Sequence, residues 1–400
     1  MKIVLAYSGG LDTSFAVHYC TFQQAHEIHA AVADTGAFSA EKIQEMESRA
    51  IALGAKSFTC LDIRQEVFDR FFAYVVKGNL LRGGVYPLCV AAERTAQAEA
   101  IANHALALGA EGIAHGSTAA GNDQIRFDLA CAAMAPDLAI LAPVRDLGWT
   151  RDQEADYLAQ NSHPVDSTTS TYSVNESLWG VTIGGGETHD PWRIPPESVY
   201  QMTRPVDQTP SNSREIIIGF QEGIPTSLDH ENLSGPTLIA RLNDLAGEHG
   251  VGRGFHLGET VLGIKGRIAF EAPAPIVLIQ AHRELEKLVL TQGQLDWLGR
   301  VSLDYGNRLH EGHYHAPVMR DLEALIDHAQ RTVFGEVRVR LHRGQSQVLG
   351  VRSPKALLDP LARYGEETQM WNGRDAEGFG RISGISSRIA SRRDHRGTSP

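Results

Sequence analysis

The 400-residue chain has few cysteines, and none of them is arranged for redox or metal chemistry. Cys20, Cys60, Cys89 and Cys131 are scattered, without a Cys-x-x-Cys pair or a Cys/His spacing typical of a zinc site. This pattern favours a reducing compartment and argues against a disulfide framework. No apolar run reaches the roughly 18 residues that a membrane helix requires, and the N-terminus carries no signal-peptide pattern. We therefore expect a cytoplasmic protein without a membrane partner.

An excess of basic residues is also missing. The formal net charge is −11, whereas nucleic-acid-binding surfaces usually carry an excess of lysine and arginine, so we expect no nucleic-acid partner. With 42% hydrophobic and 21% charged residues the composition is that of an ordinary globular enzyme. The length is typical of a chain with two or three domains. We expect its substrates to be small molecules.

The most informative segment is a loop that follows an apolar strand at the N-terminus. The loop reads Ala6, Tyr7, Ser8, Gly9, Gly10, Leu11, Asp12, Thr13 and Ser14. Adjacent glycines let backbone N–H groups approach a phosphate, and the start of a helix adds partial positive charge. The hydroxyls can donate to phosphate oxygens, and Asp12 can help to hold Mg²⁺. The pattern Ser-Gly-Gly-x-Asp-Ser/Thr is typical of pyrophosphate loops, which cleave ATP to AMP and PPi, and it lacks the Gly-Lys-Ser/Thr ending of a Walker A loop.

Strands and helices alternate over residues 1–165, which predicts an α/β domain with a doubly wound parallel sheet. The expected strands are residues 3–6, 28–33, 57–61, 112–115 and 138–144. The expected helices are residues 13–23, 40–53, 65–76, 91–108 and one that begins with a capping box at Thr150. Because such a sheet binds ligands at the carboxyl ends of its strands, residues 6–14, 33–34 and 115–123 are expected to share one cleft.

A second, α+β domain is expected over residues 166–360, followed by a C-terminal segment over residues 361–400. Strand or helix patterns occur at residues 215–220, 261–264, 276–290 and 321–333, and residues 337–341 and 348–351 read as a hairpin. The last 15 or so residues are polar and basic, which predicts a frayed tail. A histidine-rich stretch at residues 309–315 favours surface or oligomer contacts, with a metal site at His313 and His315 as the alternative.

Two long motifs resemble those of the argininosuccinate synthase family. Residues 6–14 resemble the ATP loop of that family, and residues 115–127 resemble its second motif. Shorter matches follow in order at residues 172–173, 190–192, 249–253 and 375–379, so the resemblance runs from Met1 to about Ile385. It implies an adenine nucleotide alpha-hydrolase-like fold, a synthetase domain and a C-terminal helix that forms homotetramers.

The family uses ATP to adenylate the ureido oxygen of citrulline, which releases PPi, and the amino group of aspartate then displaces AMP. The resemblance implies that ATP is bound by the loop over residues 6–14, by Ala33 and by Gly116, and that aspartate is bound by Thr118, Asn122 and Asp123. The implied acceptor ligands are Tyr86, Ala91, Asn122, Arg126, Ser173, Thr182, Glu259 and Phe270. Asp12, Asp123 and Arg126 are the implied catalytic residues, with ATP and Mg²⁺ as cofactors. Tyr86 as a core aromatic residue and Asn122-Asp123 as a simple turn remain the alternatives.

Several acceptor positions depart from the family pattern. Ala91 stands where the family has a serine, and Phe270 stands where it has a tyrosine. Gly258 stands where it has a glutamate, which a one-residue register shift would restore as Glu259. A serine is replaced by Thr182, which keeps the hydroxyl. In the second motif Ala119-Ala120 replaces Gly-Lys, and Asp128 replaces a glutamate. By contrast, the ATP and aspartate positions are almost unchanged.

The sequence therefore predicts an ATP-dependent carbon–nitrogen ligase that joins aspartate to an adenylated acceptor. Since losing one hydrogen bond to a charged group costs about 1.5–3 kcal/mol, the departures favour an acceptor other than citrulline, without its α-ammonium group or less polar. Ordinary argininosuccinate synthesis and a non-catalytic nucleotide-binding paralogue are the alternatives. A tRNA-modifying enzyme or a glutamine-dependent synthetase is disfavoured, since the expected cysteine motifs are missing.

Overall fold

A computed structural model describes residues 1–119, 121–164, 171–366 and 368–396. The chain forms two compact units, Met1–Lys355 and Ala356–Pro400, and each is described by itself. Ala120 and the predicted domain boundary at residue 165 lie outside the described residues. The division of the first unit into a nucleotide domain and a synthetase domain stays a prediction.

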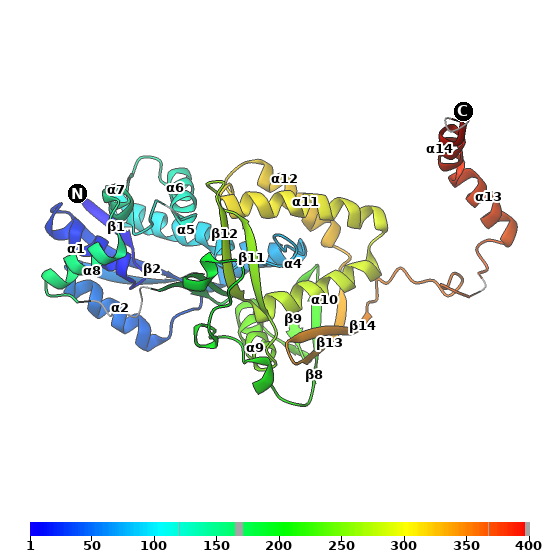
Figure 1. The fold of residues 1–400 in the computed structure, drawn as a ribbon, viewed down its shortest axis with the longest axis horizontal. Coiled ribbons are helices and arrows are strands. Elements are labelled where there is room, and N and C mark those ends of the chain that lie inside the picture. Colours follow the sequence, from blue (N-terminus) through cyan, green and yellow to red (C-terminus); the bar gives the residue numbers. More distant parts are fainter. Residues whose placement is uncertain (120, 165–170, 367, 397–400) are drawn as a thin grey trace. The chain divides into compact units, whose positions relative to one another are not determined.

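A five-stranded parallel sheet forms the N-terminal part of the first unit, in the order β3-β2-β1-β4-β5. Its strands β1 and β2 are labelled in Figure 1. Its strands are β1 (Lys2–Ala6), β2 (Glu27–Asp34), β3 (Ser57–Asp62), β4 (Gly112–His115) and β5 (Ala139–Leu141). Ile3 and Leu5 pack into one core, whereas Val4 packs into another on the opposite face. Both faces of the sheet are therefore covered, as the near-continuous apolar strands require.

Helices cover the two faces in the doubly wound manner that the sequence predicts. One face carries α1 (Leu11–Phe22), α2 (Ala40–Ala52) and α8 (Arg151–Gln160), and the other carries α5 (Ala91–Leu108) and α6 (Asp123–Met134). Between β3 and α5 the chain forms α3 (Arg64–Val67), a π-helical turn (Phe68–Phe72) and α4 (Ala73–Lys77). The capping box at Thr150 is confirmed. In the described ranges, no helix combines the length and the apolar character needed to span a bilayer.

The predicted strand over residues 138–144 is too long. β5 ends at Leu141, and Pro143 begins α7 (Pro143–Leu147). Proline fits the first turn of a helix because its missing N–H would have no partner there and its φ is already helical. The apolar run therefore changes from strand to helix at this proline.

Two antiparallel sheets follow in the same unit. One has the order β11-β12-β7-β6, with β6 (Tyr172–Ser177), β7 (Gly180–Gly185), β11 (Arg253–Glu259) and β12 (Lys265–Glu271). The other has the order β10-β9-β8-β13-β14, with β8 (Arg214–Gln221), β9 (Ile224–Leu228), β10 (Glu231–Asn232), β13 (Gly335–His342) and β14 (Gln345–Arg352). The helices are α9 (Gly235–Glu248), α10 (Pro273–Val289), α11 (Gln292–Glu311) and α12 (Val318–Gln330).

The predicted hairpin is confirmed as β13 and β14, but the strand or helix pattern predicted at residues 261–264 is wrong. These residues form the turn between β11 and β12, closed by a 2.8 Å hydrogen bond from Thr260 N to Ile264 O. The short apolar pattern contains Gly263, which marks a turn more often than a strand interior.

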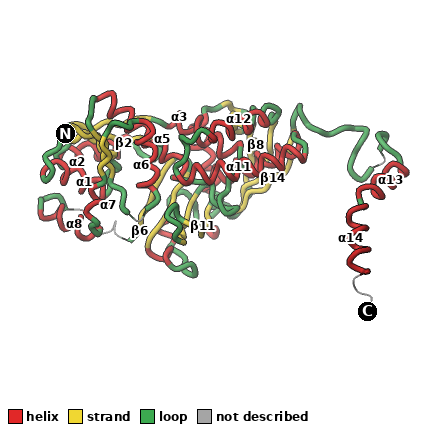
Figure 2. Tube along the Cα trace, turned by 90° about the horizontal axis from the view of Figure 1, so that it is seen from above, coloured by secondary structure: helices red, strands yellow, loops and turns green. Residues whose placement is uncertain are grey.

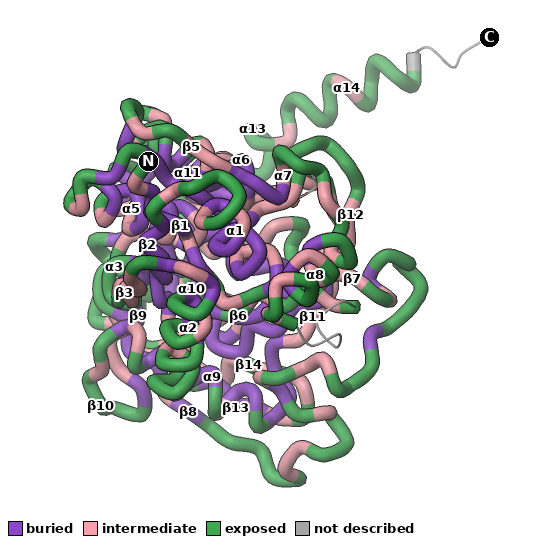
Figure 3. Tube along the Cα trace, turned by 90° about the vertical axis from the view of Figure 1, so that its left-hand side faces the viewer, coloured by how far each residue is buried: buried purple, intermediate pink, exposed green. Residues whose placement is uncertain are grey.

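A stacked aromatic pair joins the nucleotide part to the second half of this unit. The ring of Phe72 stacks on that of Trp179 at 4.5 Å between centroids, and both side chains are buried. Trp179 also donates its Nε1–H to the carbonyl of Pro87 at 2.8 Å. Figure 3 shows that buried residues continue through the interior of the unit. The loop before α5 is thus attached to this core.

The C-terminal unit contains α13 (Gly373–Ser383) and α14 (Ile385–Arg396), drawn as the last helices of the trace in Figure 2. Asn372 forms a capping box with Asp375 at the start of α13. The predicted frayed tail is wrong over residues 385–396, where the absence of proline and glycine lets a helix form. The two helices expose the apolar side chains of Phe379, Ile382, Ile385 and Ile389.

Candidate active site

The carboxyl ends of β1, β2 and β4 bring the predicted nucleotide segments together. The chain leaves β1 toward one face of the sheet and leaves β4 toward the other, so a crevice opens between these neighbouring strands. Gly116 follows β4 directly, and a Cβ at this position would lie 3.0 Å from Thr13 N and 3.1 Å from Asp12 C. The absence of a side chain at Gly116 lets the two loops touch.

The loop after β1 has the conformation of an anion cradle. Gly9 has a φ of +76°, which other residues adopt only with strain. Thr13 Oγ1 lies 3.3 Å from Ser8 Oγ and donates to Gly10 O, which holds the turn closed. Ser14 Oγ is buried next to the Tyr7 hydroxyl. A hydroxyl at this place can also donate to a phosphate oxygen.

Not every residue of this loop faces a ligand. Tyr7 and Leu11 are buried in the core on the α1 face of the sheet, whereas Ala33, at the end of β2, is buried in a different core. Such positions would contribute backbone groups and shape to the site.

Asp12 lies beside two residues of α8 that the sequence reasoning missed. Its Oδ1 is 3.8 Å from Arg151 Nη1 and makes no hydrogen bond in the described structure. Burial raises the pKa of Asp12, and Arg151 opposes this effect. Burial, with repulsion from Asp12, raises the pKa of Glu154 to about 8, so Glu154 is protonated at neutral pH. The capping box at Thr150 fixes the start of α8. It was the feature of the sequence from which the place of Arg151 and Glu154 on a helix could have been predicted.

The aspartate motif lies at the start of α6. Asp123 accepts hydrogen bonds at 2.9 Å from Arg126 Nη1 to one oxygen and from Arg94 Nε to the other. Burial opposes its ionisation, but the two guanidiniums outweigh burial and hold the pKa of Asp123 below its ordinary value. Asn122 accepts a 2.8 Å hydrogen bond from Val261 N in the β11–β12 turn, and Thr118 is partly exposed in the preceding loop.

Arg94 is a third site residue that the sequence did not indicate. It lies on α5 and donates from Nη2 to Asn175 Oδ1 on β6 at 2.8 Å, in addition to its bond with Asp123. The feature of the sequence that could have indicated Arg94 is that it is the one arginine in a helix rich in alanine. It links the aspartate motif to the antiparallel sheet.

One face of that sheet gathers most of the predicted acceptor residues. Thr182 pairs with Asn175 on one side and with Phe270 on the other, so these side chains share a face. Ser173 lies two residues before Asn175 and is exposed on the same face. Ala91 is buried as the first residue of α5.

Tyr86 is buried against this sheet. Its ring stacks on His256 at 5.3 Å between centroids and lies 5.3 Å from the ring of Phe270. Its hydroxyl donates to the carbonyl of Cys89, and burial raises the pKa of Tyr86. In this packing Tyr86 resembles the core aromatic that the sequence left as an alternative.

Glu259 does not take the place of the missing glutamate. Glu259 pairs with Lys265 in the strand ladder and binds its Nζ at 2.8 Å, and Gly258 pairs with Gly266. Since side chains alternate along a strand, Glu259 points to the face opposite His256. The one-residue shift that could have restored the glutamate is not seen, and such a shift would turn every side chain of β11 to the other face.

A buried carboxyl group lies under the site on α5. Glu93 is 1% exposed and close to Thr35 and Ser177. Burial raises its pKa to about 7, opposed by Arg94. Elsewhere, Asp128 stands where the family has the longer glutamate. It accepts hydrogen bonds from His115 Nε2 at 3.0 Å and from Arg145 Nη1 at 2.6 Å, so both of its carboxylate oxygens have a partner.

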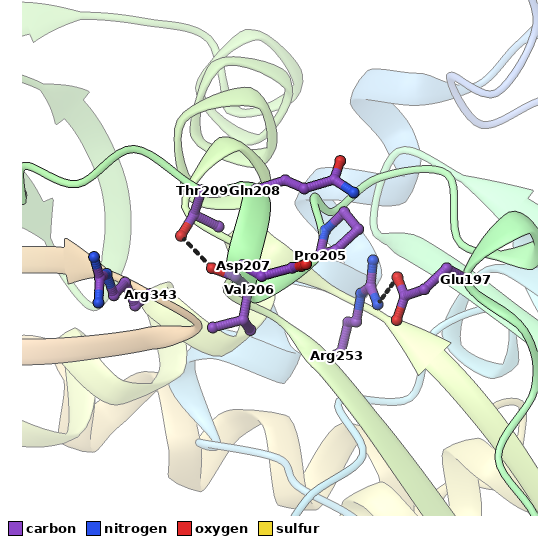
Figure 4. Close-up of a pocket in the computed structure, with 8 residues that line it drawn as sticks. All are labelled: Glu197, Pro205, Val206, Asp207, Gln208, Thr209, Arg253 and Arg343. Carbon is purple, nitrogen blue, oxygen red and sulfur yellow. Dashed lines mark hydrogen bonds and ion pairs between the residues drawn. The ribbon is translucent and has the colours of Figure 1, made fainter.

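The surface hollow in Figure 4 is a separate feature. It is lined by Glu197, Pro205, Val206, Asp207, Gln208, Thr209, Arg253 and Arg343, and includes none of the predicted site residues. The described residues contain no group of three or more potential metal ligands. The histidine-rich stretch ends α11 and enters a turn, where His315 lies 3.1 Å from Glu99.

Comparison with known proteins gives the family. The described geometry is that of a parallel α/β sheet with a glycine-rich loop after its first strand, followed by two antiparallel sheets. Residues 2–164 match the family model of the "Arginosuccinate synthase N-terminal HUP domain", and residues 172–390 match that of the "Arginosuccinate synthase C-terminal domain". The chain belongs to the argininosuccinate synthase family, and with it to the ATP-dependent ligases that form carbon–nitrogen bonds.

Curated relatives extend over nearly the whole chain. An "Argininosuccinate synthase" of Rubrobacter xylanophilus is 40% identical over 97% of this chain and 94% of the relative. Those of Pelodictyon phaeoclathratiforme (38%, covering 98% of each chain) and Staphylococcus carnosus (37%, 98% of this chain and 97% of the relative) are similar. These names support ordinary argininosuccinate synthesis, the alternative in the sequence analysis, better than its main prediction of a different acceptor.

A solved structure described as a predicted subunit of tRNA methyltransferase, from Methanocaldococcus jannaschii, covers 41% of this chain and 89% of that chain at 12% identity. Its TM-score of 0.26 is too low to support an argument.

Gly116→Ala is expected to weaken ATP binding by tenfold or more, about 1.4 kcal/mol. The new Cβ would push against the backbone of residues 12 and 13 and open the phosphate loop. Isothermal titration calorimetry with ATP measures the effect. Gly121→Ala is the matched control, because its Cβ would lie 3.7 Å from the nearest atom and should leave the affinity unchanged.

Glu93→Gln is expected to raise the thermal midpoint more at pH 8 than at pH 5. The folded-state pKa of Glu93 is raised, so its neutral form stabilises the fold fully below pH 4.5, and this contribution is lost as the pH rises to about 7. Thermal melts from pH 4.5 to 8.5 should show the difference between the proteins growing up to about pH 7 and then levelling. A difference independent of pH would contradict this assignment.

Proposed function

We propose that the protein catalyses argininosuccinate synthesis, in which ATP, citrulline and aspartate give argininosuccinate, AMP and PPi. The observation that supports this most is the meeting of the phosphate loop with the segment after β4 in the crevice between two neighbouring strands. The names of the full-length relatives support citrulline as the acceptor.

The reaction would proceed in two displacements. The ureido oxygen attacks the α-phosphorus of ATP and PPi leaves, and the amino group of aspartate then attacks the activated carbon and AMP leaves. The loop over residues 6–14 would hold the phosphates through backbone N–H groups and the buried Ser14 hydroxyl. No side-chain nucleophile is needed, so positioning and charge stabilisation supply the catalysis.

The donor set fits Mg²⁺ at one point. Asp12 carries a buried carboxylate oxygen that makes no hydrogen bond, and carboxylate oxygen is a ligand that Mg²⁺ prefers. Asp12 would hold the ion together with the phosphates. The ion, when bound, neutralises the charge of the departing PPi.

The remaining catalytic groups would orient the second nucleophile and the acceptor. Asn122 and Asp123 lie at the N-terminus of α6, and Thr118 lies in the loop before it. We assign these residues to aspartate, and Arg126 to the acceptor. Asn122 Oδ1 accepts a hydrogen bond from Val261 N, so the β11–β12 turn lies beside the residues that we assign to aspartate.

An acceptor other than citrulline is the second candidate, and the acceptor face itself favours it. Ala91, Phe270 and Gly258 offer no hydroxyl or carboxylate, and Glu259 points away. A non-catalytic paralogue is disfavoured by the intact nucleotide loop.

We further propose that the protein is a cytoplasmic homotetramer assembled through its C-terminal unit. This unit has its own helices, and none of the α13 residues is buried within the chain. The apolar residues that α13 and α14 expose would be covered by neighbouring subunits.

The function predicts PPi release that depends on all three substrates. Purified protein with ATP, Mg²⁺ and aspartate should release PPi only when an acceptor is added, and mass spectrometry should detect argininosuccinate when the acceptor is citrulline. Asn122→Ala should lower kcat/KM by at least tenfold, the effect of about 1.4 kcal/mol. Absence of PPi release with every ureido acceptor would exclude the ligase function.

Assembly through the C-terminal unit predicts that the triple variant Phe379→Ser, Ile382→Ser, Ile389→Ser forms an oligomer of lower mass than the wild type. Loss of this apolar surface removes the driving force for association. Light scattering after size-exclusion chromatography measures the mass. The matched control replaces charged residues of the same helices, Glu377→Ser and Arg388→Ser, and should keep the mass of the wild type.

A further inference from the structure

Arg151, the first residue of α8, lies beside the phosphate loop. Its Nη1 is 3.8 Å from Asp12 Oδ1, a distance at which the two charges attract each other without a direct hydrogen bond. The Arg151 side chain is 37% exposed, whereas Glu154, one helical turn further along, is 0% exposed. Of these two residues of α8, only Arg151 can therefore touch a ligand held by the loop.

Aromatic packing holds the start of α8 against α1, the helix that begins in the phosphate loop. The ring of Phe15 on α1 lies 5.1 Å from that of Trp149 and 5.3 Å from that of Tyr157, measured between centroids. The capping box at Thr150 fixes the first turn of α8 between these two contacts. Arg151 is thus anchored from both sides of its position in the chain.

The two nucleotide motifs themselves carry little positive charge. Residues 6–14 contain no lysine or arginine, and residues 115–127 contain only Arg126, whose guanidinium is bonded to Asp123. A triphosphate is strongly anionic, and PPi gains negative charge as its bond to the α-phosphorus breaks. In addition to Mg²⁺, a fixed cation beside the loop would stabilise this charge, and Arg151 is placed to supply it.

The direction of the displacement points to the PPi end of ATP. Asn122 and Arg126, which we assign to aspartate and to the acceptor, lie at the start of α6, and α6 covers one face of the sheet. Arg151 lies with α1 and α8 on the other face. Attacking and leaving oxygens stand roughly in line across a reacting phosphorus. An acceptor on the α6 side therefore directs PPi toward the side on which Arg151 lies.

We propose that Arg151 binds the β- and γ-phosphates of ATP and stabilises PPi as it leaves. Arg151 would act in the proposed ligase reaction, on which this inference rests, and it belongs to neither of the two long motifs. A guanidinium carries several N–H donors in one plane, so it can serve two phosphate oxygens and still lie beside Asp12. Its effect is greatest while the bond between the α-phosphorus and the bridging oxygen breaks, because PPi then gains its charge.

Binding of different parts of the nucleotide tests which end Arg151 contacts. In calorimetric titrations with Mg²⁺ and without acceptor, Arg151→Ala should weaken binding of ATP and of PPi at least about tenfold, the effect of losing one bond to a charged group. Binding of AMP should stay unchanged. Equal losses for ATP and AMP, or no loss for ATP, would overturn the inference. Arg241→Ala removes an exposed arginine of α9 that is paired with Glu231, and as the matched control it should change none of these affinities.

Two further variants separate the charge of Arg151 from its packing. Arg151→Lys keeps the positive charge without the planar fork of donors, and Arg151→Gln keeps a polar side chain without the charge. The lysine variant should bind ATP more tightly than the glutamine variant and less tightly than the wild type. Thermal melts without nucleotide check that both variants fold alike. Equal ATP affinities of two equally stable variants would show that the charge is not used, and the inference would fail.

Turnover distinguishes this inference from the ligase function itself. With saturating ATP, citrulline and aspartate, Arg151→Ala should lower kcat for PPi release at least about tenfold, because the lost contact is strongest in the transition state. The KM values for citrulline and aspartate should change little, since both are assigned to the α6 side. A normal kcat would reject the role of Arg151 and keep the ligase function. Wild-type protein that binds ATP through Arg151 but releases no PPi with any ureido acceptor would reject the ligase function and keep the phosphate contact.

Discussion

The ion network around Asp123 is the interaction on which the arrangement of the site depends. Arg94 from α5 and Arg126 from α6 hold the two oxygens of Asp123, and the same guanidiniums continue to Asn175 on β6 and to the His310 carbonyl on α11. One buried carboxylate thus fixes four elements that are distant in sequence. Removing either partner of such a buried pair leaves an uncompensated charge, which is strongly destabilising.

The network also connects the phosphate loop on one side of the crevice with the acceptor residues on the other. Asp123 belongs to the segment after β4, which touches the phosphate loop at Gly116, and Arg126 reaches the acceptor side through His310. The aspartate and the acceptor would therefore be held by neighbouring residues at the start of α6, next to the loop that would hold the nucleotide. Catalysis by positioning requires this kind of rigid connection, because small displacements of reacting atoms cost much of the rate.

Much of the nucleotide domain could be predicted from the sequence. Alternation of apolar strands with helices gave the parallel sheet, and the glycines and hydroxyls of residues 6–14 gave its ligand, because local backbone geometry and hydrogen bonding require these residue types. The errors occurred where local signals compete. Pro143 turned an apolar run into a helix, Gly263 turned another into a turn, and the polar C-terminal residues formed α14.

The acceptor side was decided by tertiary structure alone. The sequence by itself determined that an ATP loop is present and that Ala91, Gly258 and Phe270 lack polar groups. Only the strand pairing showed that Glu259 faces away, and only the packing of α11 against α6 brought His310 to Arg126, 184 positions apart in the chain. Side-chain direction in a sheet and contacts between distant elements depend on register and packing, which no local pattern specifies.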